Sequence, residues 1–126
     1  MSLSFTGYAA IWDRMDRVGD VMRRGAFAGA GRVPLLWQHR GAAMGRIESL
    51  VEDATGLAVA GVVEDPVLAA LVRSGAVAGL SVGYRPRVVH QGAARAILSA
   101  ELIEISLVTV PMQPLARVNH LSTKGN

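Results

Sequence analysis

Cysteine is absent from this 126-residue sequence, and aromatic residues make up only 5% of it. The absence of cysteine excludes disulfide frameworks, zinc-thiolate sites and a cysteine nucleophile, and it favours a reducing compartment such as the cytoplasm. The scarcity of aromatic rings leaves too few side chains for the base-stacking platform of a single-strand nucleic-acid binder. Hydroxyl, imidazole and carboxylate groups remain as the main candidates for chemistry.

Lysine is nearly absent as well, because Lys124 is the single lysine among 13 basic residues. The net charge is +3, and the arginines are spread along the chain, with Arg23-Arg24 before Gly25 as the nearest approach to a cluster. Such spacing is typical of solvated surface charge rather than of a nucleic-acid arm. We expect no specific nucleic-acid partner, and a small basic nucleic-acid binder remains an outside alternative.

Long apolar runs are also missing, although 51% of the residues are hydrophobic. No uncharged stretch approaches the roughly 18 apolar residues of a membrane span, and the start of the sequence lacks the features of a signal peptide. We therefore expect no membrane partner. The apolar content suffices for one core, so we expect a single domain over residues 1–118 and a flexible tail over residues 119–126.

The hydrophobic pattern predicts mainly strands. The expected strands are Leu3–Trp12, Val33–His39, a hairpin of Met44–Glu52 and Leu57–Val63 around a turn at Asp53–Gly56, and a pair of Leu80–Val89 and Arg95–Val110 joined at Gln91-Gly92. Helical signals are strong only after Asp65, which can cap a helix that has Pro66 at its first position and ends at Gly75. The face of this helix expected to be buried consists of Val67, Leu68, Leu71 and Val72. The predicted fold is mainly β, of the α+β kind: a closed or strongly curved β-barrel with one or more peripheral helices.

Ser81 is the first candidate for chemistry. Strand alternation places it on one face with Gly79 and Gly83, opposite the apolar side chains of the same segment. The two glycines lower the steric wall around the hydroxyl, as a substrate backbone approaching a nucleophile requires. A tight strand crossing lined by glycine and serine explains the same pattern, and it is the commoner explanation of such a segment.

Three histidines are candidates for the base that a serine nucleophile needs. His39 lies where an expected strand ends, although a capped or solvated histidine also fits that position. His90 flanks a turn and His120 falls in the expected tail, so neither is expected to be held rigidly. Position therefore favours His39.

Glu104 is the candidate for a third member of the site. Alternation points Glu104 and Ser106 away from an apolar face formed by Ile103, Ile105 and Leu107. A carboxylate there would orient His39 and stabilise its charged form, while a solvent-facing glutamate on an edge strand fits equally well. Glu101 falls on the apolar face and is the weaker alternative. Because no close ligand spacing and no phosphate-binding glycine loop occur, we expect no metal and no other cofactor.

Seven segments follow one another in a characteristic order. They are Gly7–Ala10 with Asp13-Arg14 and Asp16-Arg17, Gly19–Val21 with Arg24–Phe27, Val33–His39, Gly45-Arg46, Leu71–Val77, Gly79–Tyr84 and Glu104–Pro114. In this order they resemble the caudovirus prohead serine protease family, the capsid maturation proteases of tailed phages. Each segment alone is a weak signal, but seven in register over roughly residues 7–118 make a chance resemblance improbable.

The resemblance implies a fold similar to the herpesvirus assemblins and a serine endopeptidase that removes scaffold segments inside the procapsid. It implies that His39 and Ser81 are the catalytic pair, and that Glu104 stands where the herpesvirus enzymes use a second histidine. Backbone amides around Met112 and Gln113 would form the oxyanion hole, and the glycines beside Ser81, Gly79 and Gly83, would line the substrate site.

The partners implied by the resemblance are the major capsid protein and its scaffold segment, in the host bacterial cytoplasm. A homodimer is also expected, because assemblins are activated by dimerisation. The bias to alanine, glycine, valine and arginine suggests a GC-rich bacterial source, and hence a prophage or a gene transfer agent. The alternative function is a catalytically silent capsid-assembly or scaffold module with the same fold, in which Ser81 and His39 lie too far apart for a hydrogen bond.

Overall fold

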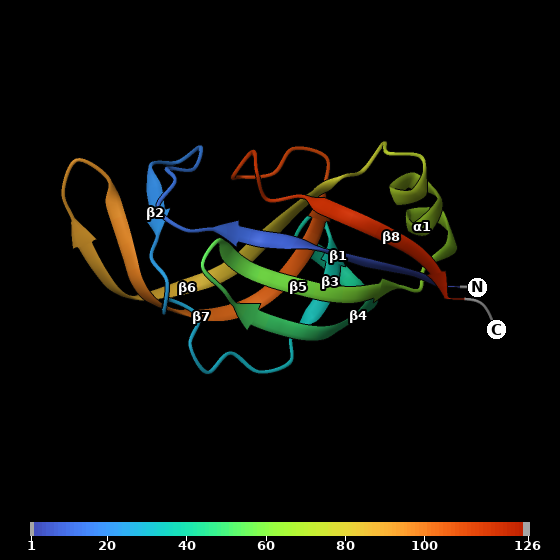
Figure 1. Cartoon of the computed structure of the whole chain (residues 1–126), viewed down its shortest axis with the longest axis horizontal. Helices are drawn as coiled ribbons and strands as arrows, with labels where there is room; N and C mark the ends of the chain where they lie inside the picture. Colours follow the sequence, from blue (N-terminus) through green and yellow to red (C-terminus); the bar gives the residue numbers. More distant parts are fainter. Residues whose placement is uncertain (1, 125–126) are drawn as a thin grey trace.

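The structure is a computed structural model that describes residues 2–124, and these form eight strands and one short helix (Figure 1). In chain order the elements are β1 (Ser2–Ile11), β2 (Asp20–Met22), β3 (Pro34–Trp37), β4 (Arg40–Glu52), β5 (Gly56–Val63), α1 (Pro66–Arg73), β6 (Gly79–Gln91), β7 (Arg95–Val108) and β8 (Val118–Lys124). The expected mainly β composition is confirmed. Within residues 2–124, no helix is long and apolar enough to cross a membrane.

The strands form one sheet in the order β2-β7-β3-β4-β5-β1-β8, with β6 paired to β7 off this path. An isolated bridge between Gly79 and Arg117 connects the start of β6 to the residue before β8. Beside it, the Leu80 amide donates to the Ala116 carbonyl at 2.9 Å. These contacts join the start of β6 to the segment before β8. The strand order itself does not form a closed ring, so the closed barrel stays a prediction.

Helix α1 begins and ends as its sequence predicts, but it buries a different face. The Asp65 side chain accepts a hydrogen bond from the Leu68 amide at 2.9 Å, which caps the first turn. The helix packs against β1 and β5 through a narrow stripe, and its buried residues are Leu68, Ala69 and Val72. Val67 is 70% exposed and Leu71 is 37% exposed, so the expectation that they are buried was wrong. The reason is that an eight-residue helix lying on one side of the sheet is covered along a single stripe only.

The expected flexible tail over residues 119–126 was also wrong for its described part. Residues up to Lys124 form β8, which pairs antiparallel with β1 from Ser2↔Lys124 to Gly7↔Val118. The other side of β1 is already paired with β5, so β8 satisfies backbone groups that would otherwise form an open edge. The polar, exposed side chains of an edge strand resemble a tail in sequence. Residues 125–126 lie outside the described residues.

The β6–β7 hairpin is the longest pair of strands, and its far half projects beyond β2 at one end of the molecule (Figure 1). Its register shifts near the middle, where Gly83 pairs with Glu104 and Tyr84 pairs with Leu102. Ile103 is therefore the extra residue of a β-bulge. It is 41% exposed, whereas Glu104 is only 7% exposed. The expectation that Ile103 shares a buried apolar face was wrong because alternation stops at this bulge.

Deletion of residues 119–126 tests the structural role of β8. The deletion removes five of the six residue pairs with β1, so at about 0.5–1.5 kcal/mol per hydrogen bond it should lower the free energy of unfolding by several kcal/mol. Urea unfolding followed by circular dichroism measures this loss. A full-length control with Asn119→Ala and Ser122→Ala keeps the backbone ladder and should unfold near the wild-type midpoint. Equal midpoints for the deletion and the wild type would contradict the assignment.

Candidate active site

His39 lies in the two-residue turn between β3 and β4. Trp37 pairs with Arg40, and the two turn residues, Gln38 and His39, both have positive φ values, 53° and 65°. Two consecutive positive φ values are typical of the tight hairpin turns that match the twist of their strands. For non-glycine residues this backbone is strained, and such strain is often found at functional sites.

Contacts with β7 hold this turn in place. The Gln38 amide donates to the Leu107 carbonyl at 3.0 Å, and the Gln38 side-chain oxygen accepts from the Thr109 amide at 3.1 Å. The His39 amide donates to the Ser106 hydroxyl oxygen at 3.0 Å. The imidazole therefore projects from a turn whose backbone is fixed by three bonds to the end of β7.

Glu104 contacts the imidazole directly. Its Oε2 lies 2.6 Å from His39 Nδ1, and its Oε1 accepts a 2.7 Å hydrogen bond from the Ser106 hydroxyl. The carboxylate is 7% exposed and Ser106 is fully buried. Because an ionised carboxylate accepts hydrogen bonds only, His39 Nδ1 carries the proton in this contact. The second ring nitrogen, Nε2, is then left as the basic one.

The same contact changes the acidity of His39. The hydrogen bond to Glu104 raises the pKa of His39 above its usual value near 6.5, and partial burial opposes part of that rise. A raised pKa means that the pair stabilises the fold at low pH and that this contribution is lost as the pH rises through the folded-state pKa. Because the imidazole is 41% exposed, solvent screens the pair.

Gly83 makes room for the Glu104 side chain. A Cβ added at Gly83 would overlap Glu104 Oε2 and lie 2.6 Å from Glu104 Cδ. No side chain larger than hydrogen fits there without displacing the carboxylate from His39. Gly83 was expected to line the substrate site, and in the structure it also packs against the Glu104 side chain.

Ser81 and His39 line one cavity of about 280 Å³. Ser81 lies on β6 opposite Ser106 of β7 and is 4% exposed, so it is less open than the sequence pattern suggests. Gly83, Met112 and Gln113 also line this cavity. Five of the residues singled out in the sequence therefore line one cavity. Glu104 is not among the lining residues, but it contacts His39, which is.

The Ser81 hydroxyl makes no hydrogen bond with His39 or with any other group in residues 2–124. It is nevertheless not sealed, because Ser4 Oγ is the one fully buried side-chain oxygen or nitrogen without a partner among the described residues. The free hydroxyl is therefore accessible from the cavity. The members of the site lie around one space, with the serine and the imidazole not yet in hydrogen-bond contact.

The loop after β7 supplies part of the cavity wall. The Gln113 side chain is buried, accepts from the Ile11 amide at 2.7 Å and donates to the Ile11 carbonyl at 3.0 Å. Arg17 donates from its backbone to the Met112 carbonyl at 3.1 Å and from Nε to the Pro111 carbonyl at 3.0 Å. The amides of Met112 and Gln113 donate to no group within residues 2–124. The loop is thus fixed while two of its amides stay free.

Gly79 is not brought to the cavity. A Cβ at Gly79 would lie 2.8 Å from Pro111 Cδ and 2.9 Å from the Val108 carbonyl oxygen. Its small size therefore allows close packing of β6 against the loop after β7. This is the tight crossing that the sequence analysis gave as the commoner explanation of the segment, and it applies to Gly79.

Two residues near the site were not assigned a role from the sequence. Ser106 was expected on the face of Glu104 without a partner, and it joins the His39 backbone to the carboxylate. Gln38 gave no signal, because its contacts with the end of β7 depend on tertiary structure. Within residues 2–124, no group of three or more histidine, aspartate and glutamate side chains is arranged to hold a metal ion.

Gly83→Ala tests the packing of Glu104 against β6. The added methyl group should displace the carboxylate, lower the pKa of His39 toward its usual value and cost about 1–3 kcal/mol of stability through overpacking. An NMR titration of the His39 ring measures the pKa. Gly92→Ala is the matched control on the same hairpin, because its added Cβ would lie 3.9 Å from the nearest atom. An unchanged pKa of His39 in Gly83→Ala would contradict the packing argument.

Comparison with solved structures relates the fold to herpesvirus proteases. The chain superposes on varicella-zoster virus protease with a TM-score of 0.65 at 16% identity, covering 98% of this chain and 65% of that one. It superposes on KSHV protease, solved in complex with a hexapeptide phosphonate inhibitor, with a TM-score of 0.66 at 10% identity, covering 98% and 66%. The chain thus spans about two thirds of the length of these proteins. The expected herpesvirus-protease-like fold is confirmed.

Comparison with protein families and with curated proteins gives one further result. No curated protein matches the sequence. The model of the caudovirus prohead serine proteases matches residues 1–126, the whole of the printed sequence. The chain therefore belongs to the caudovirus prohead serine protease family.

Proposed function

We propose that this chain is a serine endopeptidase that cleaves the scaffold segment from the major capsid protein inside the procapsid. Ser81 is the nucleophile, His39 is the general base, and Glu104 orients the imidazole. The observation that carries this proposal is the 2.6 Å contact that holds the His39 ring beside the cavity lined by Ser81. Membership of a family of prohead serine proteases supplies the substrate class.

The arrangement of His39 and Glu104 supports acyl transfer. With Nδ1 bound to Glu104, Nε2 takes the proton of Ser81 as Oγ attacks the scissile carbonyl carbon. The Glu104 carboxylate stabilises the resulting imidazolium. His39 then gives the proton to the leaving amine, the C–N bond breaks, and an acyl-enzyme remains. A water molecule, deprotonated by the same histidine, hydrolyses the acyl-enzyme and releases Ser81.

In this proposal, the step from the free chain to the reactive one brings the Ser81 hydroxyl within hydrogen-bond distance of His39. Catalytic hydrogen bonds are often long in unliganded enzymes and tighten when substrate binds. The backbone of the His39 turn is fixed by β7, and Glu104 holds the imidazole, which is 41% exposed, on its Nδ1 side. In this proposal, substrate binding or contact with a second copy in a homodimer brings Ser81 and His39 into hydrogen-bond contact.

The free amides of Met112 and Gln113 are the proposed oxyanion hole. Donors of this kind act best when they are held in place before the reaction and need no reorganisation. The buried Gln113 side chain and the two bonds from Arg17 hold the loop in this way. Gly83 lines the same cavity as Ser81, where the substrate backbone would bind.

The proposed setting is the assembling procapsid in the cytoplasm of a bacterial host. The partners are the major capsid protein and its scaffold segment, in keeping with the family. Activation by homodimer formation follows from the sequence resemblance, and an origin in a prophage or a gene transfer agent follows from the amino-acid composition.

One observation favours a second candidate function. In the free chain Ser81 and His39 form no hydrogen bond, as expected for a catalytically silent capsid-assembly or scaffold module. The retained contacts of Glu104 with His39 and Ser106 count against it, because a silent module has no use for an oriented imidazole. Cleavage of the capsid protein distinguishes the two.

Co-expression with the cognate major capsid protein tests the proposed function. The mass of the capsid subunit should decrease with the wild type and stay full length with Ser81→Ala and with His39→Ala, each of which should slow cleavage by at least about 10³-fold. Ser122→Ala and His90→Ala replace exposed residues outside the cavity and should cleave like the wild type. Particles that assemble around a full-length subunit with the wild type would instead support the assembly module.

A further inference from the structure

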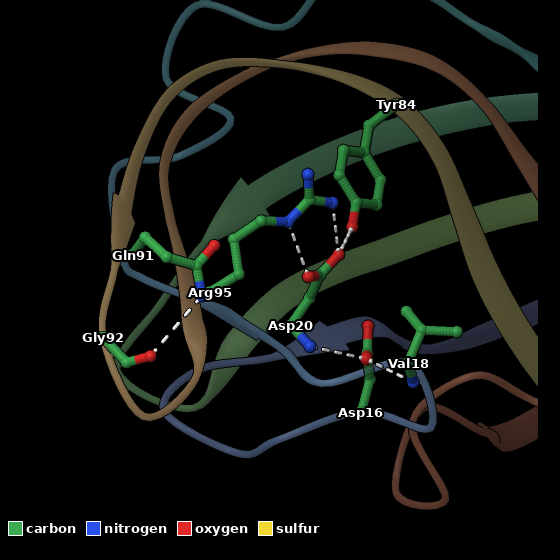
Figure 2. Close-up of polar contacts among 7 residues, drawn as sticks. All are labelled: Asp16, Val18, Asp20, Tyr84, Gln91, Gly92 and Arg95. Carbon is green, nitrogen blue, oxygen red and sulfur yellow. Dashed lines mark hydrogen bonds and ion pairs between the residues drawn. The ribbon is translucent and has the colours of Figure 1, made fainter.

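Asp16 places a carboxylate in the wall of the cavity that holds Ser81. It lies in the loop between β1 and β2 and is only 8% exposed. Its Oδ1 accepts hydrogen bonds from the amides of Val18 and Asp20, both at 2.9 Å, while the other oxygen takes part in none of the contacts drawn (Figure 2). The mechanism proposed above gives this side chain no role.

The second oxygen of Asp16 has no partner within residues 2–124, yet it is not fully buried. Ser4 Oγ is the one fully buried side-chain polar atom without a partner in the described part of the chain, so Asp16 Oδ2 keeps solvent access. The residue itself is more than nine-tenths buried, and it lines the cavity beside Ser81. The cavity wall therefore includes a buried carboxylate with one unused acceptor.

The neighbouring carboxylate, Asp20, is in contrast fully compensated. Arg95 donates to both of its oxygens, at 2.8 and 2.9 Å, and the Tyr84 hydroxyl adds a third bond at 2.8 Å (Figure 2). The Arg95 hydrogen bonds lower the pKa of Asp20. Burial, together with the Asp20 carboxylate, raises the pKa of Tyr84, so its hydroxyl keeps its proton and remains a donor.

Asp16 in contrast has no cationic side chain as a partner among the described residues. The Arg95 guanidinium is paired with Asp20, and no ion pair among residues 2–124 includes Asp16. A buried charge without a partner is costly, and a cation that enters the site gains an attraction strengthened by low solvent access. The charge of the cavity wall therefore favours a cationic ligand and disfavours an acidic one.

The rest of the cavity suits the stem of a long basic side chain. Half of the residues that line it are apolar, and they are Ala9, Val18, Met22, Leu80, Val82 and Met112. Lysine and arginine side chains combine an aliphatic stem with a charged end, so they pack along apolar walls while the end reaches a polar partner. A volume of about 280 Å³ leaves room for one such side chain next to Ser81.

We propose that Asp16 determines substrate specificity by binding the lysine or arginine side chain of a residue that flanks the scissile bond. This inference rests on the proposed function, because the cavity is a substrate site only if Ser81 cleaves a peptide. Asp16 also has a structural role in the loop between β1 and β2, and the two roles use different oxygens. Oδ1 accepts hydrogen bonds from two backbone amides, and Oδ2 binds the substrate side chain in this proposal.

The first measurement is the position of the cut. The capsid subunit released by co-expression with the wild-type protease is sequenced from its new amino terminus, and its mass is compared with the gene sequence. Lysine or arginine should stand immediately before or after the cleaved bond. Replacing that residue by methionine, which keeps a long apolar stem, should slow cleavage by the wild type at least about tenfold, and replacement by glutamate should slow it more.

The matched variant is Asp16→Asn, which keeps an oxygen for the Val18 and Asp20 amides and removes the charge. It should unfold at the wild-type temperature and cleave the lysine or arginine site and its methionine variant at nearly equal rates. Asp13→Asn is the control, because Asp13 lies in the same loop but is exposed and pairs with Arg23. The Asp13→Asn protease should prefer the basic site as strongly as the wild type does.

Each outcome decides the inference. A cut site without a flanking basic residue overturns it, and so does equal cleavage of the basic and methionine sites by the wild type, a result that does not depend on any protease variant. In both of these cases cleavage itself upholds the proposed function. A wild type that cuts nothing overturns the proposed function and this inference together.

Discussion

The contact between Glu104 and His39 is the constraint on which the rest of the site depends. A buried carboxylate at 2.6 Å from an imidazole nitrogen needs space on one side and a second donor on the other. Gly83 supplies the space, and the Ser106 hydroxyl supplies the donor. Glu104 shares a face of β7 with Ser106, next to the bulge at Ile103, and the strained turn after β3 brings His39 into contact with it. The strands β3, β6 and β7 therefore have one shared requirement, which is to hold this pair beside Ser81.

Three acidic side chains near the cavity differ in how their charge is compensated. Asp20 is paired with Arg95, and Glu104 faces an imidazole whose pKa it raises. Asp16 has backbone donors on one oxygen only. The first arrangement fixes the fold around β2. In the proposed mechanism the second prepares a base, and in the proposed specificity the third binds a substrate side chain. Burial and partners thus give the three acidic side chains different roles in this account.

Local patterns in the sequence predict the parts of this protein that depend on near neighbours. The Asp65 cap, the turn before β5 and the strand segments around Ser81 and Glu104 follow from residue types and alternation. Features that depend on pairing between distant segments could not be predicted in this way. β8 has the composition of a tail and becomes a strand because β1 has an open edge, and the role of Ser106 exists only once the His39 turn lies against β7. Alternation also cannot reveal a bulge, which is why Ile103 was placed on the wrong face.

Labelling of the nucleophile with a fluorophosphonate, as a function of pH, tests the central claim most directly. The reagent forms an O–P bond to an activated serine and releases fluoride, and it is applied to the purified protein and to particles co-assembled with capsid protein. The account predicts an adduct on Ser81, identified by peptide mass spectrometry, whose rate rises with a midpoint above about 6.5, because His39 must be neutral to act as a base and Glu104 raises its pKa. Glu104→Gln should move the midpoint to lower pH and reduce the plateau rate by about 10²–10⁴-fold. An adduct on another serine, or a Glu104→Gln profile identical to that of the wild type, would contradict the account.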